Sequence, residues 1–143
     1  DLTPAMLEKF KEWIGKQKRK DIQLHEANVL SLERDLPKGW NNFDLIVSAN
    51  MLEHIPREQL PQALINLHGL LNENGKLIVF VEKANFLNRT LVRLYWKSES
   101  YTRDQLLNIF QNAGFRTPKI DEFGKKTFRC FSIVAQPESK MAQ

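Results

Sequence analysis

The stretch Asn42-Phe-Asp-Leu-Ile-Val-Ser-Ala-Asn-Met-Leu-Glu-His-Ile55 decides the fold of this chain. Its first part, Phe43 to Val47, is an almost continuous run of large apolar and β-branched residues that follows a turn rich in glycine and asparagine, which predicts a buried central strand. A small polar turn comes next, and Pro56 then opens a helical pattern. Because ligands of open α/β sheets bind beyond the carboxyl ends of the strands, we expect a functional site at Ser48 to His54.

Composition indicates a single globular domain. The chain has 143 residues, of which 42% are hydrophobic, with three tryptophans and nine phenylalanines, enough to build one core. Its only cysteine, Cys130, excludes an internal disulfide and a multi-cysteine metal site. No signal peptide or 18-residue apolar span is visible. We therefore expect a cytoplasmic protein with no membrane partner.

The charge is mildly positive, with a formal value of +4. Much of the excess gathers between Lys9 and Lys20, where a basic run can mark a nucleic-acid surface. Lys and Arg at a helix C-terminus also complement the helix dipole. We favour this second explanation and keep nucleic-acid binding as the lesser alternative.

The remaining chain alternates helical and strand patterns. Helices are predicted from Thr3 and Pro4 to Gly15, from Pro56 to Leu71 with Gly75 as the stop, and from Thr102 to a stop at Gly114. Strands are predicted at Asp21 to Leu24, Lys76 to Val81, Phe115 to Ile120 and Thr127 to Ala135, the last two as a hairpin. An amphipathic helix is one interpretation of Lys83 to Ser100. We expect the domain to end at 136 and residues 137–143 to form a disordered tail.

The order of these pieces resembles the later two-thirds of a class I S-adenosylmethionine-dependent methyltransferase. The motifs that carry the resemblance are, in order, Asp1-Leu-Thr-Pro-Ala-Met-Leu7, Glu26-Ala-Asn-Val29, Phe43 to Ile55, Leu70-Leu-Asn-Glu-Asn-Gly-Lys-Leu-Ile-Val79, and Asn112-Ala-Gly-Phe115 before a closing hairpin. The resemblance implies an α/β fold, a Rossmann-like sheet that is mostly parallel with an antiparallel C-terminal hairpin strand. In the family the strand order is three, two, one, four, five, seven, six.

The resemblance also implies a set of cofactor contacts. Asp1 resembles the acid that accepts hydrogen bonds from both ribose hydroxyls of S-adenosylmethionine, and Leu2 the apolar residue against adenine. Asn28 resembles the residue that bonds the adenine amino group, with Val29 beside it. Ser48 and Ala49 resemble the segment whose main-chain carbonyls meet the methionine moiety. Considered alone, Asp1 is a helix-flanking acid and Asn28 a turn residue.

Glu53 and His54 are the candidate catalytic residues, because either can move a proton in a polar site. The alternative is that both are structural, since methyl transfer by in-line displacement depends mainly on positioning. His25 and His68 lack further ligands at a recognised metal spacing, so no metal is expected. The aromatic and basic residues from Phe86 to Tyr101 indicate a small or medium-sized, partly apolar acceptor, or else a surface helix.

The sequence has no first strand and no Gly-x-Gly turn ahead of Asp1, so the first two strands of the family sheet are missing. Three explanations remain open: the chain is part of a longer one, another chain supplies the strands, or it is a shortened non-catalytic relative. We favour the first, because Asp1 stands in the middle of a motif. The leading hypothesis is a methyltransferase, and the rivals are a non-catalytic interaction module or partner subunit and a nucleic-acid-binding domain.

Overall fold

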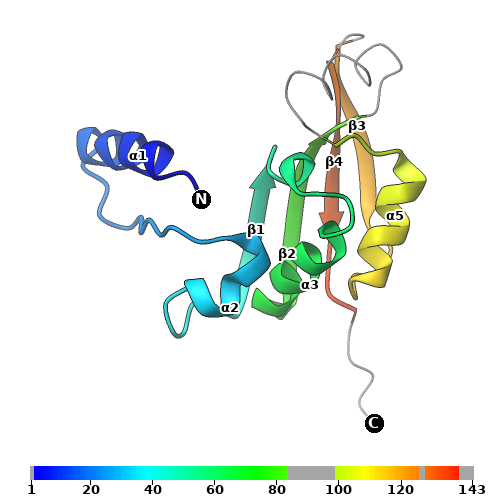
Figure 1. Cartoon of the computed structure of the whole chain (residues 1–143), viewed down its shortest axis with the longest axis horizontal. Coiled ribbons are helices and arrows are strands. Elements are labelled where there is room, and N and C mark those ends of the chain that lie inside the picture. Colours follow the sequence, from blue (N-terminus) through cyan, green and yellow to red (C-terminus); the bar gives the residue numbers. More distant parts are fainter. Residues whose placement is uncertain (1, 84–98, 126–127, 139–143) are drawn as a thin grey trace. The chain divides into compact units, whose positions relative to one another are not determined.

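The computed structural model describes residues 2–83, 99–125 and 128–138. The chain divides into two compact units, Asp1–Trp40 and Asn41–Gln143, and each is described by itself. The first unit contains helix α1 (Pro4–Lys16), the 3-10 turn η1 (Val29–Ser31) and the short helix α2 (Leu32–Asp35) (Figure 1). The predicted start of α1 is confirmed, because Thr3 is the N-cap residue and Pro4 the first helical residue.

The strand predicted at Asp21 to Leu24 is wrong. Residues 22–28 form neither helix nor strand, and none of the strands in the described part of the chain pairs with them. A strand gains its stability from hydrogen bonds and side-chain contacts with a neighbouring strand. Without that neighbour, the apolar residues of this segment do not form a strand.

In its described residues, the second unit is a four-stranded sheet with two α-helices. Its elements are β1 (Phe43–Ala49), the 3-10 turn η2 (Leu52–His54), α3 (Leu60–Leu70), β2 (Leu71–Glu82), α5 (Arg103–Asn112), β3 (Lys119–Lys125) and β4 (Phe128–Ala135). The strands lie in the order β1-β2-β4-β3 (Figure 1). β1 and β2 are parallel, whereas β4 is antiparallel to both β2 and β3.

This order agrees with the family order four, five, seven, six, and the predicted parallel pairing of Phe43–Val47 with Leu77–Val81 is confirmed. Val47 lies opposite Ile78 and Ser48 opposite Val79. The predicted C-terminal hairpin is confirmed as β3 and β4, although β3 begins at Lys119 rather than at Phe115. Only one of the three strand pairs described is parallel, so the mostly parallel character is limited here to β1 and β2.

β1 is not the buried central strand that its composition predicts. It is the first strand in the order of the described sheet, and the side chains of Leu45 and Val47 are 52% and 55% exposed. Ser48 is the buried residue of this strand. An apolar sequence is buried only where neighbouring elements cover both its faces and both its edges, and β1 has β2 as its partner in the described sheet.

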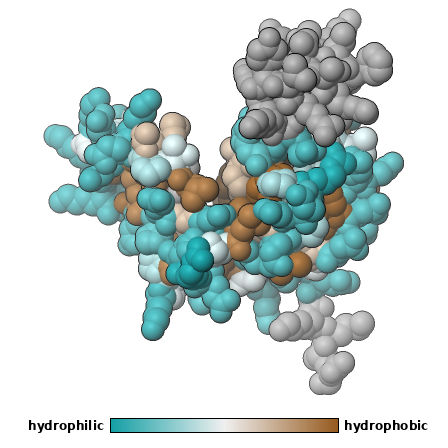
Figure 2. Space-filling view, in the orientation of Figure 1, coloured by the Kyte–Doolittle hydropathy of each residue, from teal (hydrophilic) through white to brown (hydrophobic). Residues whose placement is uncertain are grey.

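The core lies between the sheet and the two helices that cover one of its faces (Figure 1). Alternate residues of β2 and β4 face these helices, in keeping with the two-residue period of strands. The buried side chains are Leu60, Ala63, Leu64 and Leu67 of α3, Leu106 and Phe110 of α5, Leu77, Val79 and Val81 of β2, and Phe131, Ile133 and Ala135 of β4. In the same view the outer surface of α3 and α5 is largely polar (Figure 2), as expected of amphipathic helices.

Gly75 does not stop a helix, contrary to the prediction. Helix α3 ends at Leu70, and Leu71 is already extended, with φ −80° and ψ 148°. Gly75 instead lies buried in β2, where a Cβ atom would come within 2.7 Å of the carbonyl oxygen of Phe43. The glycine is therefore required for a close approach of two backbones at the start of the β1–β2 pair.

The helix predicted from Pro56 begins only at Leu60, and α1 continues past the predicted stop at Gly15 to Lys16, but the signals of α5 behave as predicted. Thr102 and Gln105 form a capping box at the start of α5, and Gly114 has φ +87° just after its end, a conformation that glycine adopts at low cost. Beyond the predicted domain end at 136, Pro137 bridges to Phe115 and the N–H of Glu138 donates to the carbonyl of Gly114.

The amphipathic helix suggested for Lys83 to Ser100 falls mostly on residues 84–98, which lie outside the described residues, as do residues 139–143 of the predicted tail. No helix in the described ranges is long and apolar enough to cross a membrane.

Candidate functional site

The carboxyl ends of β1 and β2 carry the polar residues that the sequence predicted as a site. Ser48 is buried and Ala49 is exposed at the end of β1. Asn50 follows in the left-handed region, with φ +50°, and its N–H donates to the carbonyl of Phe80 at 3.0 Å. Asparagine tolerates this conformation better than most residues, so the chain can turn sharply directly after the last residue of β1.

The turn η2 places Glu53 and His54 in different environments. Glu53 is only 4% exposed, whereas His54 is exposed to solvent. The Oε2 atom of Glu53 has no hydrogen-bond partner among the described residues. Burial raises the pKa of Glu53, and the nearby carboxylate of Glu82 raises it further. Of the two candidate catalytic residues, Glu53 is thus the one enclosed by the protein.

Residues Glu99 to Tyr101, called here the return segment, pack against this turn. The N–H of Glu99 donates to the carbonyl of Glu53 at 2.7 Å. Tyr101 forms a parallel bridge with Lys83, directly after the end of β2. The return segment therefore lies between η2 and the carboxyl end of β2.

The side chain of Arg57 also binds the return segment. Its guanidinium donates to the carbonyl oxygen of Ser100 at 2.9 Å and to Oε2 of Glu99 at 3.4 Å, and it lies 5.0 Å from the centroid of the Tyr101 ring. Guanidinium groups in this position gain cation–π attraction as well as hydrogen bonds. One arginine thus contacts all three residues of the return segment.

Tyr101 is fully buried, and its hydroxyl group has no hydrogen-bond partner in the described part of the chain. Burial raises the pKa of Tyr101 to about 12, and neighbouring carboxylates, including those of Glu99 and Glu53, add to the effect. The hydroxyl group is therefore neutral and remains a hydrogen-bond donor at physiological pH.

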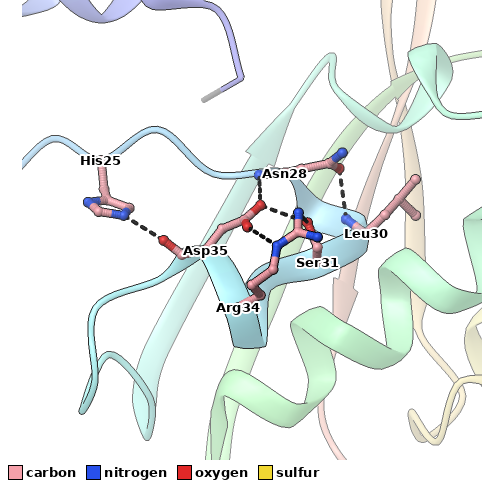
Figure 3. Close-up of polar contacts among 6 residues, drawn as sticks. All are labelled: His25, Asn28, Leu30, Ser31, Arg34 and Asp35. Carbon is pink, nitrogen blue, oxygen red and sulfur yellow. Dashed lines mark hydrogen bonds and ion pairs between the residues drawn. The ribbon is translucent and has the colours of Figure 1, made fainter.

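In the first unit, Asn28 belongs to a network centred on Asp35 (Figure 3). The side-chain oxygen of Asn28 accepts a hydrogen bond from the backbone N–H of Leu30 at 2.9 Å. The backbone N–H of Asn28 donates to Oδ2 of Asp35 at 3.1 Å. The hydroxyl of Ser31 and the guanidinium of Arg34 also donate to Asp35, at 2.7 and 2.9 Å. The hydrogen bonds from Ser31, then Arg34 and Asn28, lower the pKa of Asp35 to about 2, so this carboxylate holds the Asn28 turn rigidly.

The predicted site residues fall in both units. Leu2 is exposed before α1, Asn28 is the N-cap of η1, and Val29 is the first residue of that turn. In the second unit Ser48 and Ala49 end β1, and Glu53 and His54 follow it. Asp1 and the aromatic and basic side chains between 84 and 98 lie outside the described residues.

Metal ligands are not brought together in the described ranges, where no group of three or more His, Cys, Asp or Glu side chains is placed to hold an ion. Cys130 is half-buried in β4 with a free thiol, and burial raises its pKa.

Sequence reasoning missed two residues that shape these sites, Asp35 and Arg57, and it included Tyr101 only as the last residue of the Phe86 to Tyr101 segment. Ser31 and Asp35 are four positions apart, a spacing that brings side chains together on a helix, so the contact of Asp35 with Ser31 could have been predicted from the sequence. Arg57 and Tyr101 lie 44 positions apart, and only tertiary structure shows their contact.

Comparison with protein families identifies a close match for most of the motifs above. The family described as "Methyltransferase domain" matches residues 1–77, more than half of the chain. The chain belongs to this methyltransferase family. A search of curated proteins gave no match.

Solved structures support the same fold for the methyltransferase chain. PigF, solved with SAH, superposes with a TM-score of 0.74 at 19% identity, over 93% of this chain and 41% of PigF. Magnesium protoporphyrin IX methyltransferase from Synechocystis PCC 6803, with bound SAH, gives 0.74 at 12% identity, over 96% and 62%. A putative O-methyltransferase from Nostoc punctiforme PCC 73102 gives 0.73 at 23% identity, over 93% and 42%. The chain therefore spans less than two thirds of the length of these proteins.

Proposed function

We propose that this methyltransferase domain takes part in S-adenosylmethionine-dependent methyl transfer to a small or medium-sized acceptor by in-line displacement. The observation that carries the proposal is the parallel β1–β2 pair, in the family strand order, with the small polar turn Ser48 to Asn50 at its carboxyl end. In open α/β sheets this edge is where ligands bind.

The residues present fit such a cofactor. Ala49 is small and exposed, so the main chain at the end of β1 is approachable. The side-chain oxygen of Asn28 uses one lone pair to accept the N–H of Leu30. Its second lone pair can accept a hydrogen bond from an adenine amino group. The residues that the resemblance implies for the cofactor are Asp1, Leu2, Asn28 and Val29 in the first unit, and Ser48 and Ala49 in the second. When bound, the cofactor supplies a methyl group activated by a sulfonium.

β1 is the edge strand of the described sheet, which supports a proposal about a further strand that pairs with it. Leu45 and Val47 are more than half exposed on this strand, and unpaired strand edges are a liability that proteins usually cover. We infer that a further strand, from an upstream segment or a second chain, pairs with β1. Its addition would complete the sheet beside the proposed cofactor site.

Calorimetric titration of the chain with S-adenosylhomocysteine tests this function without knowledge of the acceptor. We expect a dissociation constant of about 100 μM or tighter, equivalent to roughly 5.5 kcal/mol. Asn28→Ala removes both the cap of η1 and the proposed contact and should weaken binding. Asn28→Asp keeps an acceptor oxygen at the same place and should retain more of it.

Failure to bind S-adenosylhomocysteine at millimolar concentration would contradict the proposal for this chain. The alternative, a non-catalytic interaction module or partner subunit, would then be favoured. Salt-sensitive binding to mixed oligonucleotides, with no cofactor binding, would instead favour the nucleic-acid hypothesis.

A further inference from the structure

Two of the three buried side-chain oxygen atoms that have no hydrogen-bond partner among the described residues lie near the carboxyl end of β2, the third being Oγ of Ser48 in β1. They are Oε2 of Glu53 and the hydroxyl oxygen of Tyr101. Glu53 is 4% exposed and Tyr101 is fully buried. An unpartnered buried polar group destabilises the folded chain, so two of them in one region require an explanation.

The two residues lie in one neighbourhood. The backbone of Glu53 accepts the N–H of Glu99 at 2.7 Å, and Tyr101 is only two residues further along the return segment. Arg57, four residues after Glu53, covers the Tyr101 ring at 5.0 Å. Burial raises the pKa of Tyr101 most, and the carboxylates of Glu99 and Glu53 raise it further, whereas Arg57 opposes them.

The two groups have complementary hydrogen-bonding roles. The carboxylate oxygen of Glu53 is an acceptor, whereas the neutral hydroxyl group of Tyr101 is a donor. A group that fits both must donate one hydrogen bond and accept another. A hydroxyl group does so with a single oxygen atom.

We propose that Glu53 and Tyr101 together bind the hydroxyl group of the methyl acceptor, an inference that rests on the proposed function and names its acceptor class. The acceptor O–H donates to Oε2 of Glu53, and the acceptor oxygen accepts from the hydroxyl group of Tyr101. The pair therefore serves an oxygen nucleophile.

Lone-pair counting distinguishes a hydroxyl from an amine at this pair. A hydroxyl oxygen has two lone pairs, so it can accept from Tyr101 with one and keep the other for attack. A neutral amine nitrogen has one lone pair, which the hydrogen bond from Tyr101 would occupy. The same pair that orients an alcohol or phenol thus suppresses the reactivity of an amine.

Glu53 can also accept the proton that the acceptor hydroxyl group loses. If the acceptor oxygen attacked the methyl group of bound S-adenosylmethionine, an O–C bond would form, the S–C bond would break and S-adenosylhomocysteine would be the leaving group. The acceptor O–H bond would break, its electron pair would stay on oxygen, and the proton would pass to Oε2 of Glu53, which would become a carboxylic acid. A buried carboxylate is more basic than an exposed one, which favours this transfer. His54 is exposed and is not needed for the step.

Both oxygens are buried, so an acceptor reaches them only when the surrounding protein opens. Arg57 contacts all three residues of the return segment, so we infer that it is a positioning residue for Tyr101.

The test uses phenol as the probe and the 143-residue chain labelled with ¹³C at the glutamate carboxyl carbons. Phenol should shift the Glu53 resonance in a saturable titration, whereas toluene, which lacks the hydroxyl group, should not. Tyr101→Phe and Glu53→Gln keep shape and volume, and calorimetric titration of each variant should show phenol binding weakened about tenfold, or roughly 1.4 kcal/mol.

Glu73→Gln, an exposed glutamate at the start of β2, is the matched control and should leave phenol binding unchanged. The proposal is overturned if phenol leaves the Glu53 resonance unmoved, or if both variants bind phenol as the original chain does. Titration with S-adenosylhomocysteine separates the two proposals: lost cofactor binding with intact phenol binding refutes methyl transfer and leaves the hydroxyl site standing.

Discussion

Replacement of Gly75 by alanine should destabilise the second unit through a single steric contact. The added Cβ would lie 2.7 Å from the carbonyl oxygen of Phe43, 3.0 Å from that of Asn72 and 3.0 Å from Cδ2 of Leu71. Two of these three neighbours are backbone atoms, which cannot rotate away. The strand itself must therefore shift where the β1–β2 register is already irregular, between Phe43 and Leu45.

Overpacking of this kind costs about 1–3 kcal/mol, and the rigid backbone neighbours place Gly75→Ala in the upper half of that range. For a domain of about 100 residues, a loss of about 2 kcal/mol lowers the Tm by roughly 8 °C. Gly75 is not in the left-handed region, so the whole effect is attributed to the contact.

Urea denaturation followed by circular dichroism measures the free energy of unfolding of both chains. The matched control is Gly69→Ala in α3, where an added Cβ meets nothing within 4 Å and should stabilise the helix by about 0.5–1 kcal/mol. Equal stability of Gly75→Ala and the original chain would refute the close-approach explanation. A loss of stability in Gly69→Ala would show that alanine is disfavoured for another reason.

Four further predictions concern caps and buried groups. Tyr101→Phe removes an unpartnered hydroxyl group and should raise the free energy of unfolding by about 1–2 kcal/mol in urea denaturation. Thr102→Ala breaks the capping box of α5 and should cost about 1 kcal/mol by the same assay, with Thr102→Ser as the control. The lowered pKa of Asp35 means that its contribution to stability is present above about pH 4 and is lost as the pH falls toward 2, so Asp35→Asn should flatten the denaturation profile over that range. The raised pKa of Glu53 has the opposite sign, so Glu53→Gln should be more stable than the original chain at pH 7, with the gain lost below about pH 4.

Each of these four predictions would be contradicted by a specific result. A destabilised Tyr101→Phe chain would mean that the hydroxyl group has a bonding partner in solution. Equal losses for Thr102→Ala and Thr102→Ser would remove the cap as the cause. Parallel pH profiles for the original and variant chains would show that Asp35 or Glu53 titrates normally in the folded state.

Local signals in the sequence were sufficient wherever their partners lie within a few residues. Thr102 and Gln105 cap α5 because both hydrogen bonds close within one helical turn. Gly114 takes a positive φ because the chain must leave the helix there. The apolar runs at Phe43 and Leu77 became parallel strands because a helix separates them along the chain.

Signals that depend on distant partners were misread or missed. Asp21 to Leu24 has strand composition, yet no described strand pairs with it. Gly75 has the position of a helix stop, yet its role is set by the carbonyl of Phe43, a residue 32 positions earlier.

The sequence by itself determined the class of fold, the order of the elements and the edge of the sheet where a site was expected, because periodicity, caps and turns act over short distances. Tertiary structure alone decided which residues share that edge. It buried Glu53 and exposed its neighbour His54, and it brought Tyr101 beneath Arg57 from a distant part of the chain. Burial and desolvation depend on the whole packed unit, so the chemistry of this carboxylate and hydroxyl group could not be read from the residues in order.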